Sequence, residues 1–403
     1  MSSGEVAIAN IISNHPMTLE EDRMRKRRAR GDTTWVATLI PGLPDDVVRR
    51  ILVNLPRSSW FNLRSVSKAW RKTVEDPSFY HSRVDLKLTE EWCYTEAWHP
   101  ETKLVSWFAF DFNQSMWTAL PPIPKKRGLD PEIFGRASSS LRGELYVVGG
   151  KAGVSGPTLR EVFIYSPFTH RWRKGKSMIT TRHSPLMFSI FECKIYVMGG
   201  FDFLNNVIDT GECYDIDTDE WTLVGNVDQP EILCPSWYHT GWQVPWTRFH
   251  FMDDEHYISY KTIDERQVVK YYVPRNGKWV FTEHRDKAKA LMRYSLGGVV
   301  NMDIVMLDWV NSRLRYTYHS SRTVGWETVP GLADLNWVAI LTTNPKVSAV
   351  GSKFVMVGRG LSVWMIETNP TLLKARDRKF IDIFPAKVDV QDMEPLLCVT
   401  VVA

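Results

Sequence analysis

The chain has 403 residues, of which 44% are hydrophobic and 24% are charged, and its formal net charge at pH 7 is +4. This composition is typical of a soluble globular protein large enough for two or three domains or one repeat array, and the small net charge makes nucleic-acid binding unlikely. The five cysteines are scattered and form no CxxC pair, and no uninterrupted apolar run reaches membrane-spanning length. The sequence therefore indicates neither a disulfide framework nor a zinc site, and we expect a reducing compartment and no membrane partner.

Residues 1–36 are predicted to form a polar, disordered tail that ends in the basic block Arg23–Arg30. Such a block repels itself and stays solvated. Two interpretations stay open, a nuclear localisation signal or anionic-surface contact on one side and a solvated arm without a receptor on the other. The expected localisation is the nucleus and the cytoplasm.

Residues 37–80 are predicted to form a helical module with more apolar surface than it can bury. A first helix begins with Pro44 in its first turn and is stopped by Pro56, and Ser58 or Ser59 can cap a second helix. The apolar positions of that second helix are Trp60, Leu63, Val66, Trp70 and Val74. About forty residues are too few for a self-sufficient core, so the surplus apolar face must be covered by the rest of the chain or by another protein.

The order of apolar residues and prolines in this module resembles an F-box. The residues we assign to its contact surface are Leu43, Pro44, Val47, Ile51, Leu52, Leu55, Pro56, Val66 and Trp70. The family's module is a three-helix unit that docks on the Skp-type adaptor of cullin-based ubiquitin ligases, so the resemblance implies an adaptor and, through it, a cullin as partners. Ser67 departs from the pattern, because the family often has Cys there. The alternative is an ordinary helical hairpin that packs on a larger domain.

After a junction over residues 81–88, the chain changes to short aromatic and β-branched runs separated by turn residues, which predicts strands over residues 89–403. The segment 141–172 recurs at 192–221, each time as a double glycine followed by an aromatic residue seven positions before a tryptophan. Such pairs are Phe110–Trp117, Tyr165–Trp172, Tyr214–Trp221 and Tyr272–Trp279, with a looser copy at Tyr318–Trp326. A period near fifty residues with four short strands in each unit predicts propeller blades.

The physical role of each repeat position can be stated. The double glycine is expected where the backbone needs a positive φ or passes close to another segment, and each aromatic residue and its tryptophan should lie on neighbouring antiparallel strands. This pattern resembles the kelch repeat, although the full signature occurs only in residues 141–172 and 192–221. The first blade appears to lack its innermost strand, and we predict that residues 396–403 supply it and close the ring.

The predicted fold is thus mainly β with a small α module, an N-terminal three-helix F-box followed by a six-bladed kelch β-propeller closed by the C-terminal strand. Binding sites on propellers form from loops around the central channel. By resemblance to kelch substrate receptors, Arg136, Arg182 and His183 are placed at the pocket mouth, with a solvated loop charge as the alternative. The loops after the double glycines, 151–160 and 201–206, are candidates too, although plain tolerance of insertions also explains their length.

An irregular aromatic stretch over residues 234–251 is the third candidate. Trp237, Tyr238 and Trp242 could form an aromatic anchor at the channel mouth, and the alternative is packing between blades.

No catalytic motif is found, and the ten histidines are dispersed, with His239, His250 and His256 as the nearest approach to a cluster. We therefore expect no catalytic residue, no metal ligand and no cofactor. The leading hypothesis is a substrate receptor of an SCF-type ubiquitin ligase that binds an unidentified protein target for ubiquitination and degradation. The alternatives are a non-degradative interaction scaffold or nuclear regulator, and a metal-dependent kelch enzyme.

Overall fold

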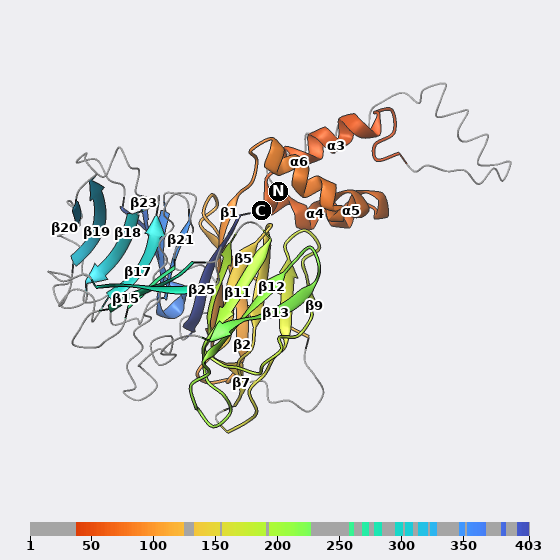
Figure 1. Ribbon diagram of the computed structural model, residues 1–403. Helices are drawn as coiled ribbons and strands as arrows, with labels where there is room; N and C mark the ends of the chain where they lie inside the picture. The colour runs from red at the N-terminus through yellow and green to blue at the C-terminus, as the bar shows by residue number, and fades with distance from the viewer. Residues whose placement is uncertain are drawn as a thin grey trace. The chain divides into compact units, whose positions relative to one another are not determined.

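The computed structural model describes residues 38–124, 133–153, 155–190, 193–226, 258–261, 268–273, 278–283, 295–300, 303–308, 313–320, 323–328, 346–350, 353–367, 380–383 and 393–402. The chain divides into two compact units, Met1–Thr89 and Glu90–Ala403. The described part of the first is helical and that of the second is almost entirely β (Figure 1).

The described part of the first unit contains four α-helices and one short 3₁₀ helix. They are α3 (Asp45–Val53), η1 (Arg57–Ser59), α4 (Trp60–Val66), α5 (Lys68–Glu75) and α6 (Pro77–Asp85). Pro44 is the N-cap of α3, and Asp45 and Asp46 occupy its first turn, where the helix dipole favours negative charge. Ser59 precedes α4 as expected, but its side chain makes no capping hydrogen bond.

The second helix predicted from the apolar periodicity is two helices, because Ser67 interrupts it. Ser67 has extended backbone angles (φ −159°, ψ 166°), and its hydroxyl oxygen accepts a hydrogen bond from the backbone N–H of Trp70 at 3.1 Å. A serine side chain can satisfy a backbone donor in this way and so end one helix and begin the next. The module therefore has four α-helices where three were expected.

Helix α6 occupies most of the predicted junction over residues 81–88. Its N-cap Asp76 accepts from the backbone N–H of Ser78 at 2.9 Å, and Pro77 takes the first helical position. Buried Arg83 donates from α6 to the carbonyl oxygens of Val53 and Leu55, at 2.6 and 2.7 Å. These bonds satisfy carbonyl groups at the end of α3 and fix α6 to it.

The described strands of the second unit form antiparallel sheets (Figure 1). The first three, in order of pairing, are β25 (Glu394–Val402), β1 (Glu91–Trp98), β2 (Val105–Asp111) and β3 (Met116–Ala119); β5 (Ala137–Leu141), β6 (Glu144–Val148), β8 (Val162–Ser166) and β9 (Arg171–Lys174); and β10 (Leu186–Ile190), β11 (Lys194–Met198), β12 (Thr210–Asp215) and β13 (Glu220–Asn226). Each predicted repeat unit is therefore one four-stranded sheet here.

Three further sheets and a small ribbon complete the described β structure. They are β14 (Ile258–Lys261), β15 (Val268–Val273) and β16 (Lys278–Glu283); β17 (Ser295–Val300), β18 (Asp303–Asp308), β19 (Arg313–Ser320) and β20 (Thr323–Thr328); β21 (Lys346–Val350), β22 (Lys353–Val357), β23 (Val363–Glu367) and β24 (Phe380–Ile383); and the ribbon β4 (Ile133–Phe134) and β7 (Lys151–Ala152). A 3₁₀ turn, η4 (Arg359–Leu361), follows β22.

The C-terminal strand pairs with the first strand of this unit, as predicted. Strand β25 runs antiparallel to β1 from the pair Glu91–Val402 to the pair Trp98–Glu394, with one register shift after Glu96. It starts two residues before the predicted segment. Strand β25 also lies beside β5 and β21, while β5 lies beside β10 and β21 beside β17.

The repeated aromatic–tryptophan pairs are cross-strand neighbours, as predicted. Directly opposed residues are Phe110 and Trp117, Tyr165 and Trp172, Tyr214 and Trp221, and Tyr272 and Trp279. In the looser copy, Trp326 lies opposite Thr317 because one extra residue separates it from Tyr318. The indole N–H groups of Trp117, Trp172 and Trp221 donate to the carbonyl oxygens of Leu361, Pro121 and Lys176, at 2.9, 2.7 and 2.8 Å. These tryptophans therefore link the end of one sheet to a neighbouring segment.

Both physical reasons offered for the double glycines hold. Gly149, Gly150, Gly199 and Gly200 all have positive φ, between 62° and 105°. A Cβ at Gly149 would lie 2.4 Å from the carbonyl oxygen of Arg182, and one at Gly200 would lie 2.7 Å from that of His183. The glycines thus allow the segment before strand β10 to pass close to the ends of β6 and β11.

Candidate binding surfaces

Helix α3 presents a row of apolar side chains to solvent. Val47 and Ile51 are 40% and 46% exposed, and their spacing of four residues places them on one stripe of the helix. Leu43, which precedes N-cap Pro44, extends the row and is 40% exposed. One position further along, Val48 and Leu52 point into the module's core. The exposed row is therefore a second apolar face, which the core of the module does not need.

Three of the other predicted adaptor residues are also exposed or half-buried. Pro44 and Pro56 are exposed and Leu55 is half-buried. Leu52 is 1% exposed, so its assignment to the contact surface is wrong: its side chain belongs to the core beneath the row. Its place in the apolar pattern reflects folding of the module.

Val66 and Trp70 lie on the adjacent helices. Val66, at the end of α4, is 59% exposed, and Trp70 on α5 is half-buried. The indole N–H of Trp70 donates to the carbonyl oxygen of Leu39 at 2.7 Å, and Asp45 accepts from the N–H of Leu39 at 2.8 Å. These two bonds tether the segment that leads into α3, so Trp70 positions the start of the exposed row.

Phe61 is a surface residue that the sequence reasoning missed. It is 65% exposed on α4, next to core residue Trp60. The helical periodicity marks the inward row of Trp60 and Leu63, and Phe61 lies off that row. The signal that could have found it is a large aromatic side chain at a position where the helical pattern requires a polar one.

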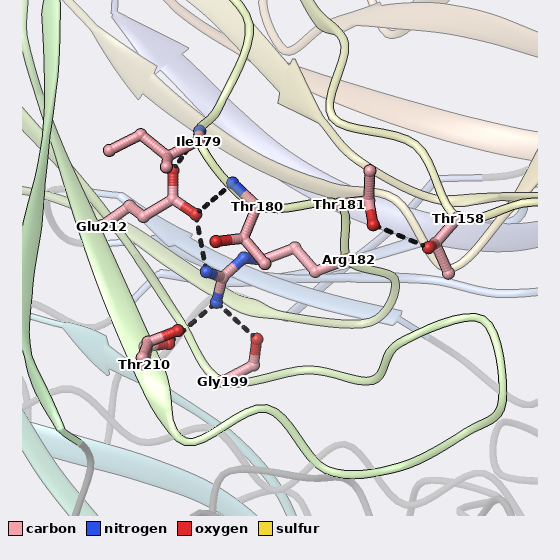
Figure 2. Close-up of polar contacts among 8 residues, drawn as sticks. All are labelled: Thr158, Ile179, Thr180, Thr181, Arg182, Gly199, Thr210 and Glu212. Carbon is pink, nitrogen blue, oxygen red and sulfur yellow. Dashed lines mark hydrogen bonds and ion pairs between the residues drawn. The ribbon is translucent and has the colours of Figure 1, made fainter.

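In the second unit, Arg182 is buried, so its assignment to a pocket mouth is wrong. The side chain is 0% exposed, and its guanidinium donates to Glu212 at 2.6 Å and to the carbonyl oxygens of Gly199 and Thr210, at 2.8 and 2.9 Å (Figure 2). The carboxylate of Glu212 also accepts from the backbone N–H groups of Ile179 and Thr180, at 2.6 and 2.9 Å. Burial lowers the pKa of Arg182, while the charge of Glu212 acts in the opposite direction.

This network joins three separate segments. It ties the loop before β10 to strand β12 and to the double-glycine end of β11 (Figure 2). Both carboxylate oxygens of Glu212 have a donor, which offsets much of the cost of burying the charge pair. Arg182 thus stabilises the structure of the loop before β10.

His183 and Arg136 are likewise occupied within the protein. His183 is 1% exposed and its ring stacks on Phe201 with centroids 5.4 Å apart. Burial lowers the pKa of His183, which favours the neutral imidazole. Arg136 makes a 2.6 Å ion pair with Glu96 on β1, and both side chains are almost inaccessible, at 8% and 1%. The expectation that these residues present charge to a ligand is therefore wrong for His183, and Arg136 offers only a small part of its side chain.

The loop over residues 201–206 has apolar side chains at its tip. Phe203 and Leu204 are 59% and 64% exposed. The carboxylate of Asp202 accepts from the N–H groups of Leu204 and Asn206, both at 2.8 Å. Lys151 donates to the carbonyl oxygen of Phe203 at 3.3 Å. The loop was predicted as a binding candidate, and its exposed apolar pair is held in a defined conformation.

The other predicted site residues cannot be placed. Trp237, Tyr238 and Trp242 lie outside the described residues, as do the basic block Arg23–Arg30 and the histidines His239, His250 and His256. Within the described ranges, no group of three or more His, Cys, Asp or Glu side chains could hold a metal ion. None of the helices that the structure describes is long and apolar enough to cross a membrane.

Comparison with known proteins agrees with this architecture. The F-box domain family matches residues 40–82, and the kelch motif family matches residues 134–179 and 189–227. The Arabidopsis thaliana F-box protein AFR is 32% identical over 46% of this chain and 49% of its own length. F-box/kelch-repeat protein At1g67480 from the same plant is 25% identical over 79% of this chain and 80% of its own length.

The chain spans about half the length of the first of these relatives. A solved structure, "Structure of YjhT", shares 12% identity with a TM-score of 0.44, covering 69% of this chain and 91% of that one. The helical module coincides with the F-box match, and the two sheets with complete double-glycine signatures coincide with the kelch matches. The chain therefore carries an F-box and kelch repeats, and it is similar to F-box/kelch-repeat proteins of plants.

Proposed function

We propose that this chain is the substrate-recognition subunit of an SCF-type (Skp–cullin–F-box) ubiquitin ligase. Its F-box binds a Skp-type adaptor and, through it, a cullin, and its kelch unit binds a target protein. The chain itself performs no catalysis, because its contribution is proximity: holding both partners raises the effective concentration of a target lysine near the ubiquitin-charged enzyme. The target is then ubiquitinated and degraded.

The observation that carries this proposal is the exposed apolar row formed by Leu43 and helix α3. Leu43, Val47 and Ile51 are apolar and accessible, while the core of the module is already filled by Val48, Leu52 and Trp60. Burying an apolar surface of this kind against a partner is favourable, because it removes the surface from water. Val66 and Phe61 add exposed apolar area on α4. The adaptor is the partner that an F-box brings with it.

The test is the affinity of the full chain for a purified Skp-type adaptor. The double variant Leu43→Ala/Pro44→Ala removes two exposed anchors. Each anchor buried at an interface contributes on the order of 2 kcal/mol, so binding should weaken by about 30-fold for one anchor and by about 700-fold if the two contributions add. Leu86→Ala is the matched control, because Leu86 is 50% exposed and apolar but lies beyond α6. Unchanged binding of the double variant, with the module folded, contradicts the proposal.

We propose that the six sheets close into a six-bladed ring in which β25 is the innermost strand of the first blade. The support is the pairing of β25 with β1 and its position beside β5 and β21. Removing residues 396–403 takes most of β25 away and leaves β1 with an unpaired edge. The truncated chain should lose its cooperative unfolding transition, and a truncated chain with unchanged thermal stability would overturn the ring.

For the target-binding face we propose the loops at the double-glycine ends of the sheets, with Phe203 and Leu204 as apolar contacts and Trp237, Tyr238 and Trp242 as further anchors. Proximity labelling in cells, with and without proteasome inhibition, should reveal proteins that accumulate near the chain only under inhibition. Phe203→Ala/Leu204→Ala should lose those proteins and keep the adaptor. Leu223→Ala is the control, because Leu223 is 61% exposed but lies on strand β13.

A non-degradative scaffold or nuclear regulator is the second candidate, and the basic block Arg23–Arg30 favours it. Affinity purification separates the two, because a ligase subunit brings adaptor and cullin with it and a scaffold of the second kind does not. Nuclear and cytoplasmic localisation is part of the proposal. Replacing the arginines of the block with glutamine should shift the chain out of the nucleus if the block is a working signal.

A further inference from the structure

Two cysteines from opposite ends of the β unit meet across its first sheet. Cys93 lies on β1 and Cys398 on β25, and their sulfur atoms are 3.2 Å apart. In the register of this strand pair, Cys93 is opposite Thr400 and Cys398 is opposite Thr95, so the two cysteines are diagonal neighbours. The contact brings together thiols 305 positions apart in the sequence.

The surroundings of the pair shelter both thiols and disfavour the thiolate of Cys398. Cys93 is 0% exposed in a cluster with Phe110 and Trp117, and Cys398 packs against that cluster while keeping partial exposure. The hydrogen bond with Cys93 and burial both raise the pKa of the Cys398 thiol. The thiolate is the reactive form, so oxidation of this pair is slow and needs sustained exposure to an oxidant.

We propose that Cys93 and Cys398 are a site of reversible oxidative modification, a disulfide that latches the C-terminal strand to β1. The oxidant is a peroxide. The Cys398 thiolate attacks one peroxide oxygen to give a sulfenic acid and hydroxide, and the Cys93 thiolate then attacks that sulfur and expels a second hydroxide. The two thiol protons convert the hydroxides to water, so hydrogen peroxide is reduced to two waters as the two thiols are oxidised.

The geometry favours a disulfide that is readily reduced back to the two thiols. The sulfur atoms have to approach by about 1.2 Å to reach bonding distance. Diagonal positions in an antiparallel pair are further apart than directly opposed ones, which disfavours an unstrained bond. Strained disulfides are the easily reduced ones, and in a reducing compartment this makes the latch conditional on oxidant.

The latch acts at the strand on which neighbouring sheets depend. Strand β25 pairs with β1 and also lies beside β5 and β21. A covalent link between β1 and β25 closes almost the whole β unit into one loop, and it therefore restricts the unfolded chain strongly. Oxidation should raise the thermal stability of the unit and slow release of its C-terminal strand.

The test treats the purified full chain with hydrogen peroxide and maps peptides without reduction. We expect a linked peptide pair containing Cys93 and Cys398, a rise in Tm of at least about 4 °C, and return of both to the starting state with dithiothreitol. Carboxypeptidase should remove residues from the oxidised chain at least about tenfold more slowly. Cys193→Ser is the matched control and should behave as the unaltered chain.

Cys398→Ala should lose the linked peptide and the rise in Tm, and Cys93→Ala does the same as an independent variant. The proposal is overturned if peroxide converts the cysteines to sulfinic acids or to other pairings without this link. It is also overturned if the link forms and leaves the Tm unchanged, or if the rise in Tm persists in Cys398→Ala. All of these measurements are independent of adaptor or target binding.

Discussion

The F-box module and the kelch loops around Arg182 and His183 differ in which kind of side chain they expose. In the module, apolar side chains that would ordinarily be buried are left in water, as Ile51 is at 46% exposure. In these kelch loops, charged side chains that would ordinarily be in water are buried, as Arg182 is at 0% exposure. Exposed apolar area calls for a partner outside the chain, whereas a buried charge in an ion pair already has its partner within the chain.

The difference shows how residue type can mislead at a loop. An arginine before an innermost strand suggests a ligand-binding residue. Arg182, however, is already bound by Glu212, thirty positions further along the chain, and by two carbonyl oxygens. An isoleucine on a helix suggests a core residue, but Ile51 lies outside the core of the module. Whether a side chain is available to an external partner depends on the contacts it already makes within the fold. Comparing matched substitutions tests this.

Removing one member of the buried pair should have the largest effect. Arg182→Ala leaves the carboxylate of Glu212 in a dry site without its cation, which costs about 3–5 kcal/mol of the free energy of unfolding. Arg142→Ala is the matched control, because Arg142 makes a similar 2.7 Å ion pair with Asp217 at side-chain exposures of 41% and 59%. Exposed pairs contribute about 0–1 kcal/mol. Urea unfolding of both variants measures the difference.

Replacing both buried charges sharpens the same point. Arg182→Met/Glu212→Leu should be less destabilised than Arg182→Ala, because no charge remains in the dry site. A double variant as unstable as the single one would show that the network's backbone hydrogen bonds, and not the charge pair, carry the stability.

Adjacent residues on α3 should separate folding from binding. Leu52→Ala removes a core side chain and should cost about 2–5 kcal/mol of the free energy of unfolding of the module. Ile51→Ala truncates an exposed side chain, so it should change stability by less than about 0.5 kcal/mol while weakening adaptor binding by about 1–2 kcal/mol. Thermal unfolding and titration with the adaptor measure the two effects. Equal loss of stability in both variants would contradict the assignment of Ile51 to a docking surface.

Sequence patterns predict the β unit well because its repeats are defined by local spacing. A separation of seven residues between an aromatic residue and a tryptophan fits one hairpin, and it places Tyr165 opposite Trp172 and Tyr214 opposite Trp221. The missing strand of the first sheet identified the C-terminal segment, since one strand had to come from elsewhere. The break at Ser67 escaped, because the apolar positions on either side of it keep a helical period across the cap.

The binding residues were harder to predict, because burial depends on distant partners. Nothing near Arg136 in the sequence points to Glu96, which lies forty positions earlier on another sheet. The same holds for the Cys93–Cys398 contact. In the F-box the apolar row could be found from helical spacing, but spacing alone did not separate exposed Ile51 from buried Leu52.

The close approach at the double glycine gives a smaller effect with a clear control. Gly149→Ala adds a Cβ that would lie 2.4 Å from the carbonyl oxygen of Arg182, at a φ of 65°. Gly42→Ala places a Cβ at a similar φ of 85° with nothing within 4 Å. The backbone strain is common to both and costs about 1 kcal/mol, so Gly149→Ala should lose at least about 2 kcal/mol and Gly42→Ala about half of that. Equal losses of stability in the two variants would mean that the loop before β10 moves away from the added Cβ at little energetic cost.

The smallest effect is a pH dependence that should come from His183. Burial lowers its pKa below the ordinary value of 6.5, so the folded state holds fewer protons than the unfolded state once the pH falls below that value. The stability that neutral His183 contributes is therefore fully present above about pH 6.5 and is lost as the pH falls toward the folded-state pKa, by at most about 1.4 kcal/mol per pH unit. Urea unfolding at pH 7.5, 6.5 and 5.5 measures this slope, and His183→Gln should flatten it. A slope that survives in His183→Gln would place its origin in another titrating group.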